Sequence, residues 1–212
     1  MSHPRLILAS TSPRRKDLLA LLGFPFHVVP PTADEHALPD ETPANHVGRL
    51  ALVKARSVAH HHPTSLVIGS DTVIDLDGEI LGKPADLQEA RLMLTRLRGR
   101  SHIVHSGVAL VREARGIESV AVESVTVWIK HFSDQTLEAY LHTQDSLGKA
   151  GAYSIQGKGA HLIEKIEGDY PAVVGLPLRL TAKFLEEAGI TIPIRIYNLY
   201  QTRPYNNWKD FS

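Results

Sequence analysis

The chain has 212 residues, 43% of them hydrophobic and 22% charged, which is the balance of a globular protein of one domain or two small lobes. Lysine plus arginine and aspartate plus glutamate each number 23, so the formal net charge is zero and a broad basic face for nucleic acid is excluded. There is no cysteine, which excludes disulfide and thiolate chemistry. No apolar run approaches the ~20 residues of a membrane helix, and the N-terminal apolar run is too short for a signal peptide, so the cytoplasm is the expected location.

Apolar runs alternate with helical patterns along the chain, which predicts an α/β fold. The expected strands cover residues 6–8, 26–29, 66–69, 72–76, 79–81, 101–111, 119–132 and 160–166. The expected helices cover residues 13–22, 43–60, 86–98, 133–142 and 178–188. A hairpin turn is expected at Asp77-Gly78, and the glycine-rich segment 148–159 is expected to be a loop whose backbone approaches a neighbour closely.

The segment 8–15 is the most informative part of the chain, because it reads as strand, hydroxyl-rich loop and helix N-terminus. Ser10 or Ser12 can cap the helix, and backbone N–H groups at such a terminus attract anions. Arg14 and Arg15 add planar, bidentate phosphate donors. The segment therefore predicts a polyphosphate site, and the alternative is an ordinary capped helix with solvated arginines.

Carboxylates and cations suited to such a substrate occur further along the chain. Asp34 and Glu35 follow an expected strand, and Asp71 lies in a strand that a flexible glycine interrupts. Lys54 lies on the apolar side of its helix, and Lys83 occupies a tight loop. Carboxylates can hold a divalent metal and orient water, while lysines neutralise charge on phosphoryl oxygens. The alternatives are a solvated loop pair, a buried structural hydrogen bond and lysines at the surface.

Two features stand apart from this chemistry. His60, His61 and His62 form a consecutive run at a helix end, and consecutive helical residues face different directions, so a metal site there is disfavoured. Residues 191–212 carry aromatic side chains spaced among polar residues. They are expected to be an extension that docks on the domain or on a partner subunit, and a loose tail is the alternative.

Six strings resemble the Maf family of nucleoside triphosphate pyrophosphatases. They are LASTSPRRKDLL at 8–19, DE at 34–35, KA at 54–55, GSDTVIDLDGEILGKP at 69–84, GKAGAYSIQGKGA at 148–160 and VVGLPL at 173–178. The resemblance covers about residues 5–189 in order. It implies an elongated mixed sheet flanked by helices, with two lobes around a central cleft, as in inosine-triphosphate pyrophosphatases. It also implies cleavage of a nucleoside triphosphate to monophosphate and pyrophosphate with Mg²⁺ or Mn²⁺.

The resemblance also implies roles for individual residues. The catalytic set is Asp71, Glu35, Lys54 and Lys83. Of these, Asp71 and Glu35 would hold the metal. The substrate-binding set is Ser10, Arg14, Arg15, Thr72 and Gln156.

Three of these positions distinguish subgroups of the family. Arg14, Thr72 and Gln156 resemble the subgroup that acts on dTTP and UTP, whereas the 7-methyl-GTP subgroup has an aromatic residue, glutamine and glutamate there. A glutamine side chain offers both a donor and an acceptor, which suits the edge of thymine or uracil. The alternatives are 7-methyl-GTP hydrolysis and a nucleotide-binding regulator of septum formation without catalysis. The carboxylates favour the enzyme, because without a metal they would repel phosphate.

The resemblance leads to expectations about geometry and assembly. Residues 10–15 are expected to line one wall of the cleft and 148–159 the other, with Arg15 and Lys83 in the same cavity. Residues 1–190 would be the pyrophosphatase domain, 191–212 the extension, and a homodimer is expected. Departures from the family's common residues at Gly148, Ser106 and Pro171-Ala172 concern detail of the loop.

Overall fold

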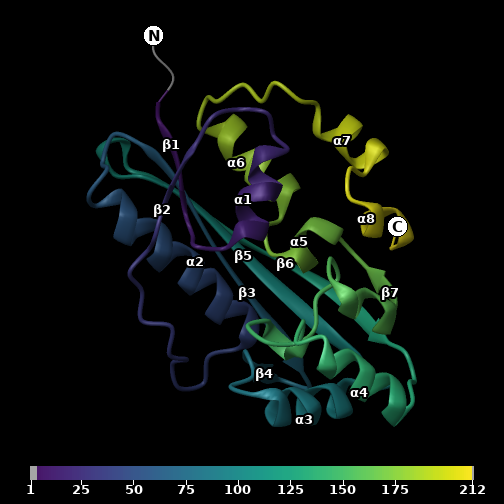
Figure 1. The fold of residues 1–212 in the computed structure, drawn as a ribbon. Helices are drawn as coiled ribbons and strands as arrows, with labels where there is room; N and C mark the ends of the chain where they lie inside the picture. Colours follow the sequence, from purple (N-terminus) through teal and green to yellow (C-terminus); the bar gives the residue numbers. More distant parts are fainter. Residues whose placement is uncertain (1–3, 212) are drawn as a thin grey trace.

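The computed structural model describes residues 4–211, and its centre is a mixed sheet with the strand order β2-β1-β3-β5-β6-β7 and β4 beside β3 (Figure 1). The strands are β1 Leu6–Ala9, β2 His27–Val29, β3 Leu66–Leu76, β4 Glu79–Leu81, β5 Ser101–Arg112, β6 Ile117–Ile129 and β7 Ile163–Glu167. Strands β2, β1 and β3 run parallel, and the remaining pairs are antiparallel. The expected α/β class is confirmed.

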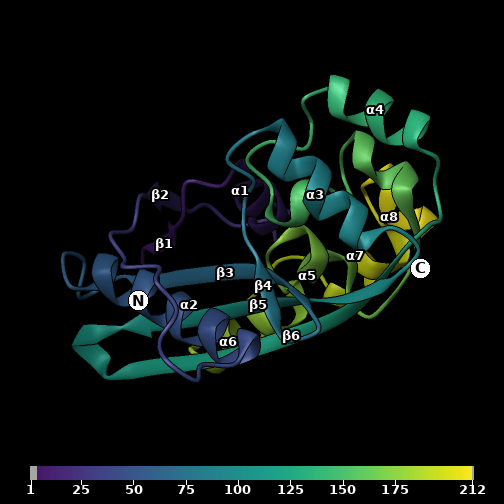
Figure 2. The same cartoon turned by 90° about the horizontal axis from the view of Figure 1, so that it is seen from below.

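Helices cover both faces of the sheet. They are α1 Pro13–Ala20, α2 Pro43–Ala59, α3 Leu87–Leu97, α4 Asp134–His142, α5 Tyr170–Val174, α6 Leu178–Glu187, α7 Ile196–Thr202 and α8 Asn206–Asp210. Short 3₁₀ turns cover Glu113–Arg115, Ala150–Ala152 and Lys158–Leu162. In Figure 2, β1, β2 and α2 lie toward one end of the long strands, and α3, α4 and the C-terminal helices toward the other. This division corresponds to the two expected lobes.

Strand alternation divides the core into two clusters, because successive side chains point to opposite faces. On β1, Ile7 packs with the alanine-rich side of α2. Its neighbours Leu6 and Leu8 pack in the larger cluster, which also includes Leu18 of α1 and Leu185 of α6. The sheet is thus held from both sides, and its strand ends are fixed in position.

Helix α2 lies unusually close to the sheet at two glycines. A Cβ on Gly69 of β3 would overlap the carbonyl oxygen of Ala51, and one on Gly107 of β5 would overlap that of Val47. The expectation that Gly69 interrupts the strand is therefore wrong, since β3 runs unbroken past it. The glycine instead leaves room for the helix backbone.

Several predicted boundaries change in the structure. Residues 160–162 belong to a 3₁₀ turn rather than to the strand expected there, and α5 was not expected at all. Residues 191–211 form α7 and α8 and pack against the larger core cluster, so in this range the docked extension is confirmed over the loose tail. Residues 1–3 and 212 lie outside the described part.

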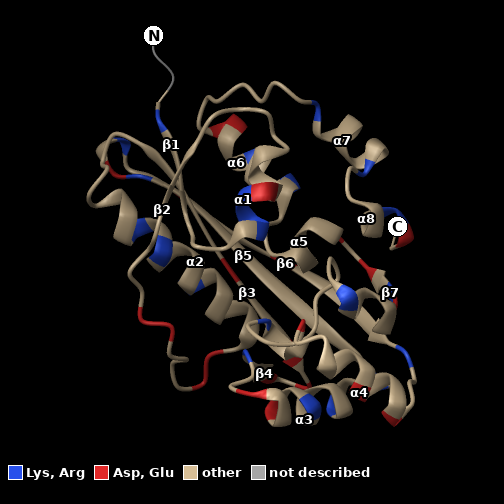
Figure 3. Cartoon of the chain, viewed as in Figure 1, with Lys and Arg blue, Asp and Glu red and all other residues tan. Residues whose placement is uncertain are grey.

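Charge is distributed evenly over the fold. Acidic and basic residues are interspersed on most elements (Figure 3), as expected from the balanced composition. Within residues 4–211, no helix is both long and apolar enough to cross a membrane.

Candidate active site

The candidate site lies at a gap along one edge of β3. On this edge, β1 pairs with 66–69 and β4 pairs with 74–76, so within the described chain residues 70–73 have no strand partner there. A cavity of about 590 Å³ opens beside the gap. It is lined on one side by residues 9–15 and on the other by residues including 148–150 and 153–155, so both predicted walls share it.

The first wall presents the N-terminus of α1. Ser12 caps the helix, with its hydroxyl 3.5 Å from the backbone nitrogen of Arg15, and its own N–H donates to the hydroxyl of Ser10 at 3.1 Å. Ser10 is buried at the end of β1. The predicted strand, loop and cap are thus confirmed, and the helix terminus faces the cavity.

A carboxylate pair lies on the α2 side of β3. The ammonium Nζ of Lys54 is 2.6 Å from Asp71 Oδ1 and 2.6 Å from Glu35 Oε1. Lys54 and Asp71 are buried, with side-chain exposures of 8% and 11%, whereas Glu35 is 60% exposed. The hydrogen bond from Lys54 lowers the pKa of Glu35 against the opposing effect of desolvation, with help from Lys83 and Arg15. The three side chains therefore form one connected group that lines the cavity.

The next residue of β3, Thr72, points to the opposite face and meets Arg15. Arg15 Nη2 donates to Thr72 Oγ1 at 3.2 Å, and Arg15 Nε donates to the Gly175 carbonyl at 2.8 Å. Thr72 Oγ1 is 2.7 Å from Ser106 Oγ, which donates to the Ala172 carbonyl at 2.7 Å. Because a hydroxyl has one proton and Ser106 uses its proton on a carbonyl, Thr72 must be the donor to Ser106. The chain thus runs in one direction from Arg15.

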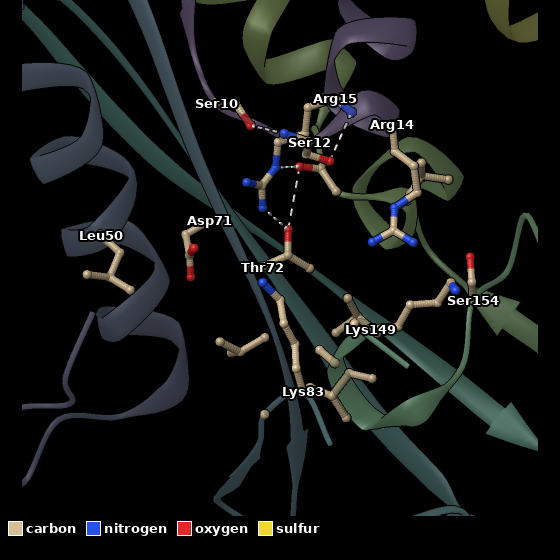
Figure 4. A pocket seen from close by; sticks show the side chains of 18 of the residues that line it. Ser10, Ser12, Arg14, Arg15, Leu50, Asp71, Thr72, Lys83, Lys149 and Ser154 are labelled. Atoms are coloured by element: carbon tan, nitrogen blue, oxygen red, sulfur yellow. Dashed lines mark hydrogen bonds between the residues drawn. The ribbon is translucent and has the colours of Figure 1, made fainter. Parts of the chain in front are cut away.

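Arg14 and Lys83 differ from Arg15 in their partners. Within residues 4–211 neither makes a hydrogen bond or ion pair with another side chain or backbone group, and both point into the cavity (Figure 4). Desolvation lowers the pKa of Arg15, and Arg14 lowers it further, while Asp71 and Glu35 raise it. Because their side chains have no such partner among the described residues, Arg14 and Lys83 are the cations available to an incoming anion.

The second wall is built from the glycine-rich segment. Tyr153 lines the cavity, and its hydroxyl is 2.6 Å from Nε2 of His102, which is buried on β5. Burial lowers the pKa of His102 to about 4, so this histidine is neutral at neutral pH. Lys149 also lines the cavity and pairs with Asp145 at 3.0 Å.

The structure gathers all but one of the predicted site residues around this cavity. Its lining includes Ser10, Arg14, Arg15, Glu35, Lys54, Asp71, Thr72 and Lys83. The lining on the second wall ends at Ile155, immediately before Gln156, which is partly exposed. Asp34 lies apart and hydrogen-bonds to His36.

Other residues of the site were not among the predicted site residues. Lys149 and Tyr153 lie in the predicted loop, where a lysine and an aromatic residue between glycines were the available signal. Ser106 and Gly175 act through hydrogen bonds to residues distant in sequence, which the sequence pattern does not reveal. The three histidines at 60–62 line a separate groove beside β2.

The cavity brings cations at a helix N-terminus together with a buried carboxylate. This arrangement is typical of an α/β protein that binds and cleaves polyphosphates. A family model described as Maf-like protein matches residues 5–188, and the chain belongs to this family.

Relatives named dTTP/UTP pyrophosphatase are similar over most of their length. The chain is 50% identical over 188 residues to a dTTP/UTP pyrophosphatase of Symbiobacterium thermophilum, covering 89% of this chain and 96% of the relative. It is 46% identical to a dTTP/UTP pyrophosphatase of Moorella thermoacetica, covering 89% and 97%.

Solved structures show more distant similarity. The Ham1 protein of Staphylococcus aureus gives a TM-score of 0.46 at 16% identity, covering 94% of this chain and 97% of that one. A HAM1 protein from Coxiella burnetii gives 0.48 at 15% identity, covering 88% and 96%.

Proposed function

We propose that this protein is a nucleoside triphosphate pyrophosphatase that hydrolyses dTTP and UTP to the monophosphate and pyrophosphate. The observation that carries the proposal is the single cavity that unites the α1 N-terminus, two unpaired cations and the Asp71–Lys54–Glu35 group. Relatives at 43–50% identity that bear the name dTTP/UTP pyrophosphatase support the choice of substrate.

The substrate's phosphates would bind between the two walls. Arg14 and Lys83 approach from opposite sides and have no competing partner among the described residues, so they would meet the negative charge directly. Arg15 is held by Thr72 and Gly175, so its orientation is set before the substrate arrives. Charge-assisted hydrogen bonds of this kind contribute roughly 1.5–3 kcal/mol each. The cations would also stabilise the charge that develops as pyrophosphate leaves.

Asp71 would orient the attacking water and accept its proton. Its carboxylate is buried, faces the cavity and is ion-paired to Lys54 through one oxygen, which leaves the other oxygen for water. Glu35 is ionised and lies on the other side of the same ammonium. Attack at either the α- or the β-phosphorus would break the bond between them and give the same products.

The donor set fits a divalent cation. Magnesium is commonly held by one or two carboxylates together with water and substrate phosphates. Within residues 4–211 no group of three or more candidate metal ligands comes together, so Asp71 and Glu35 would supply the protein's share. When bound, Mg²⁺ or Mn²⁺ would neutralise phosphate charge and lower the pKa of water.

The preference for one nucleobase over another would depend on Arg14, Thr72 and Gln156. The side-chain amide of Gln156 would pair with the donor and acceptor edge of thymine or uracil. Thr72 would act through Arg15, because its hydroxyl is already bonded there. The enzyme would consist of residues 1–190, of which 1–3 lie outside the described part, with 191–212 as an extension. It would act in the cytoplasm as a homodimer.

A panel of nucleoside triphosphates tests the proposal. With Mg²⁺ or Mn²⁺ present, pyrophosphate release should be fastest from dTTP and UTP, and slow from 7-methyl-GTP. Nucleotide binding without hydrolysis of any member would instead indicate a regulator, and a preference for 7-methyl-GTP would contradict the pyrimidine assignment.

A further inference from the structure

The C-terminal extension returns to the cavity from outside the family's matched range. The Maf-like model ends at residue 188, and the chain continues along the outside of α6 to α7 and α8 (Figure 1). Ile194 in the connecting stretch lies where a Cβ on Gly23, just after α1, would contact it at 3.0 Å. The connecting stretch therefore passes close to the end of α1.

Aromatic contacts fix the extension to α5. Trp208 is 3% exposed and stacks on Tyr170, the first residue of α5, with ring centroids 5.4 Å apart and planes 11° from parallel. Tyr200 meets Trp208 edge-on at 5.0 Å, and the guanidinium of Arg179 lies 4.1 Å over the Tyr200 ring. Helix α5 leads directly into Gly175, which holds Arg15, so the extension supports the first wall indirectly.

A hydrogen bond joins the extension to the second wall. Asn207 Nδ2 donates to the carbonyl oxygen of Ile155 at 2.8 Å. Ile155 is 2% exposed and lines the cavity. Because the peptide unit is planar, the Ile155 carbonyl and the Gln156 N–H share one plane. Asn207 therefore fixes the peptide from which Gln156 departs.

Other bonds also hold this segment. The N–H of Gly157 donates to the carbonyl of Ser154 at 3.3 Å and closes a turn around the 155–156 peptide. The hydroxyl of Tyr140 donates to the carbonyl of Ala152 at 3.2 Å, and the N–H of Lys158 donates to Asp145 at 2.8 Å. These residues all belong to the range that the family model covers. Asn207 bonds the carbonyl inside that turn from outside the family's range.

We infer that Asn207 is a positioning residue for pyrimidine recognition, acting through the 155–156 peptide, an inference that rests on the proposed function. Without its donor, the peptide can rotate and Gln156 samples orientations that do not match the base. The phosphate-binding cations and Asp71 lie on other elements, so the hydrolytic step is preserved. The extension thus tunes specificity and leaves the chemistry alone.

Two adjacent asparagines allow a matched test. Asn207→Asp keeps the shape of the side chain and removes the donor, and Asn207→Ala removes the amide. Asn206 is exposed, and its side chain makes no hydrogen bond within residues 4–211, so Asn206→Asp and Asn206→Ala control for charge and for truncation. For each variant, kcat and KM are measured with dTTP and with dGTP.

The Asn207 variants should raise the KM for dTTP by about three- to tenfold, the range expected for loss of one hydrogen bond. The kcat should change by less than about twofold, and the preference for dTTP over dGTP should fall. An unchanged KM, or a kcat that falls together with thermal stability, would overturn the inference.

Hydrogen exchange separates this inference from the proposed function. Amides of residues 152–158 should exchange faster in Asn207→Asp than in wild type and in Asn206→Asp. If wild type does not act on dTTP, the substrate proposal fails, and unaltered exchange would show independently that Asn207 does not hold the segment.

Discussion

The two walls of the cavity are built in different ways. The first wall stands on β1, α1 and β3, whose backbone hydrogen bonds repeat along a sheet and a helix. The second wall, residues 148–155, has only one short 3₁₀ turn, and side chains from distant elements hold it. Arg14, Arg15 and Asp71 lie on the elements of the first wall and Lys54 lies on α2, whereas Glu35 and Lys83 lie in loops. The comparison indicates that most of the candidate charged groups stand on regular structure, whereas Gln156, the proposed recognition residue, lies in a segment that distant side chains hold.

The largest expected effect is on the first wall. Asp71→Asn is nearly isosteric and should preserve the fold and nucleotide binding, while hydrolysis falls by about 10²–10⁴-fold because the base is lost. The measurement is pyrophosphate release with dTTP, together with nucleotide affinity. Activity within a few-fold of wild type would move the role of base to Glu35.

Lys54→Met tests whether the carboxylates act as one group. Removal of the ammonium leaves Asp71 buried without its partner, and kcat/KM should fall by roughly 10–100-fold, as for loss of a charge-assisted hydrogen bond. Since Lys54 is the main cause that lowers the pKa of Glu35, the acid limb of the pH–rate profile should move to higher pH. Lys16→Met on the exposed side of α1 is the control, and it should leave the profile in place.

His102 tests the second wall through pH. Its pKa is lowered to about 4 by burial, so between pH 6.5 and 4 the unfolded chain takes up a proton that the folded protein excludes. The free energy of unfolding should therefore fall as pH falls through this range, by roughly 2 kcal/mol at pH 5. Chemical denaturation at several pH values measures the slope. His102→Gln should flatten it, and His27→Gln, at an exposed position, should not.

The smallest expected effect on activity is at Thr72, which lies on the opposite face of β3 from Asp71. Thr72→Val removes the hydroxyl that accepts from Arg15 and donates to Ser106, so kcat/KM for dTTP should fall by about three- to tenfold. Thr72→Ser retains the hydroxyl and should recover most of the activity. Loss in Thr72→Ser with little loss in Thr72→Val would indicate that the methyl group, rather than the hydrogen-bond chain, supports Arg15.

The sequence predicted the first wall well because its signals are local. The strand, the Ser12 cap and the arginines lie within a few residues of one another, and helical periodicity placed Lys54 on the buried side of α2. The second wall and the extension depend on pairs distant in sequence, such as His102 with Tyr153 and Asn207 with Ile155. No periodicity encodes such pairs, so the loop was predicted only as a glycine-rich segment. The prediction that Gly69 interrupts the strand failed for the same reason, because the contact of this glycine with α2 joins residues distant in sequence.

Gly69 and Gly107 have a consequence for anyone who redesigns this protein. Neither is a candidate to contact substrate, yet the hydrogen atoms they carry in place of side chains set the spacing between α2 and the sheet. Lys54 extends from that helix to Asp71 on that sheet. A methyl group at either glycine would push α2 away from the sheet. It would thereby lengthen the contact between Lys54 and Asp71 without touching either residue. A set of variants restricted to the residues that line the cavity would leave Gly69 and Gly107 out.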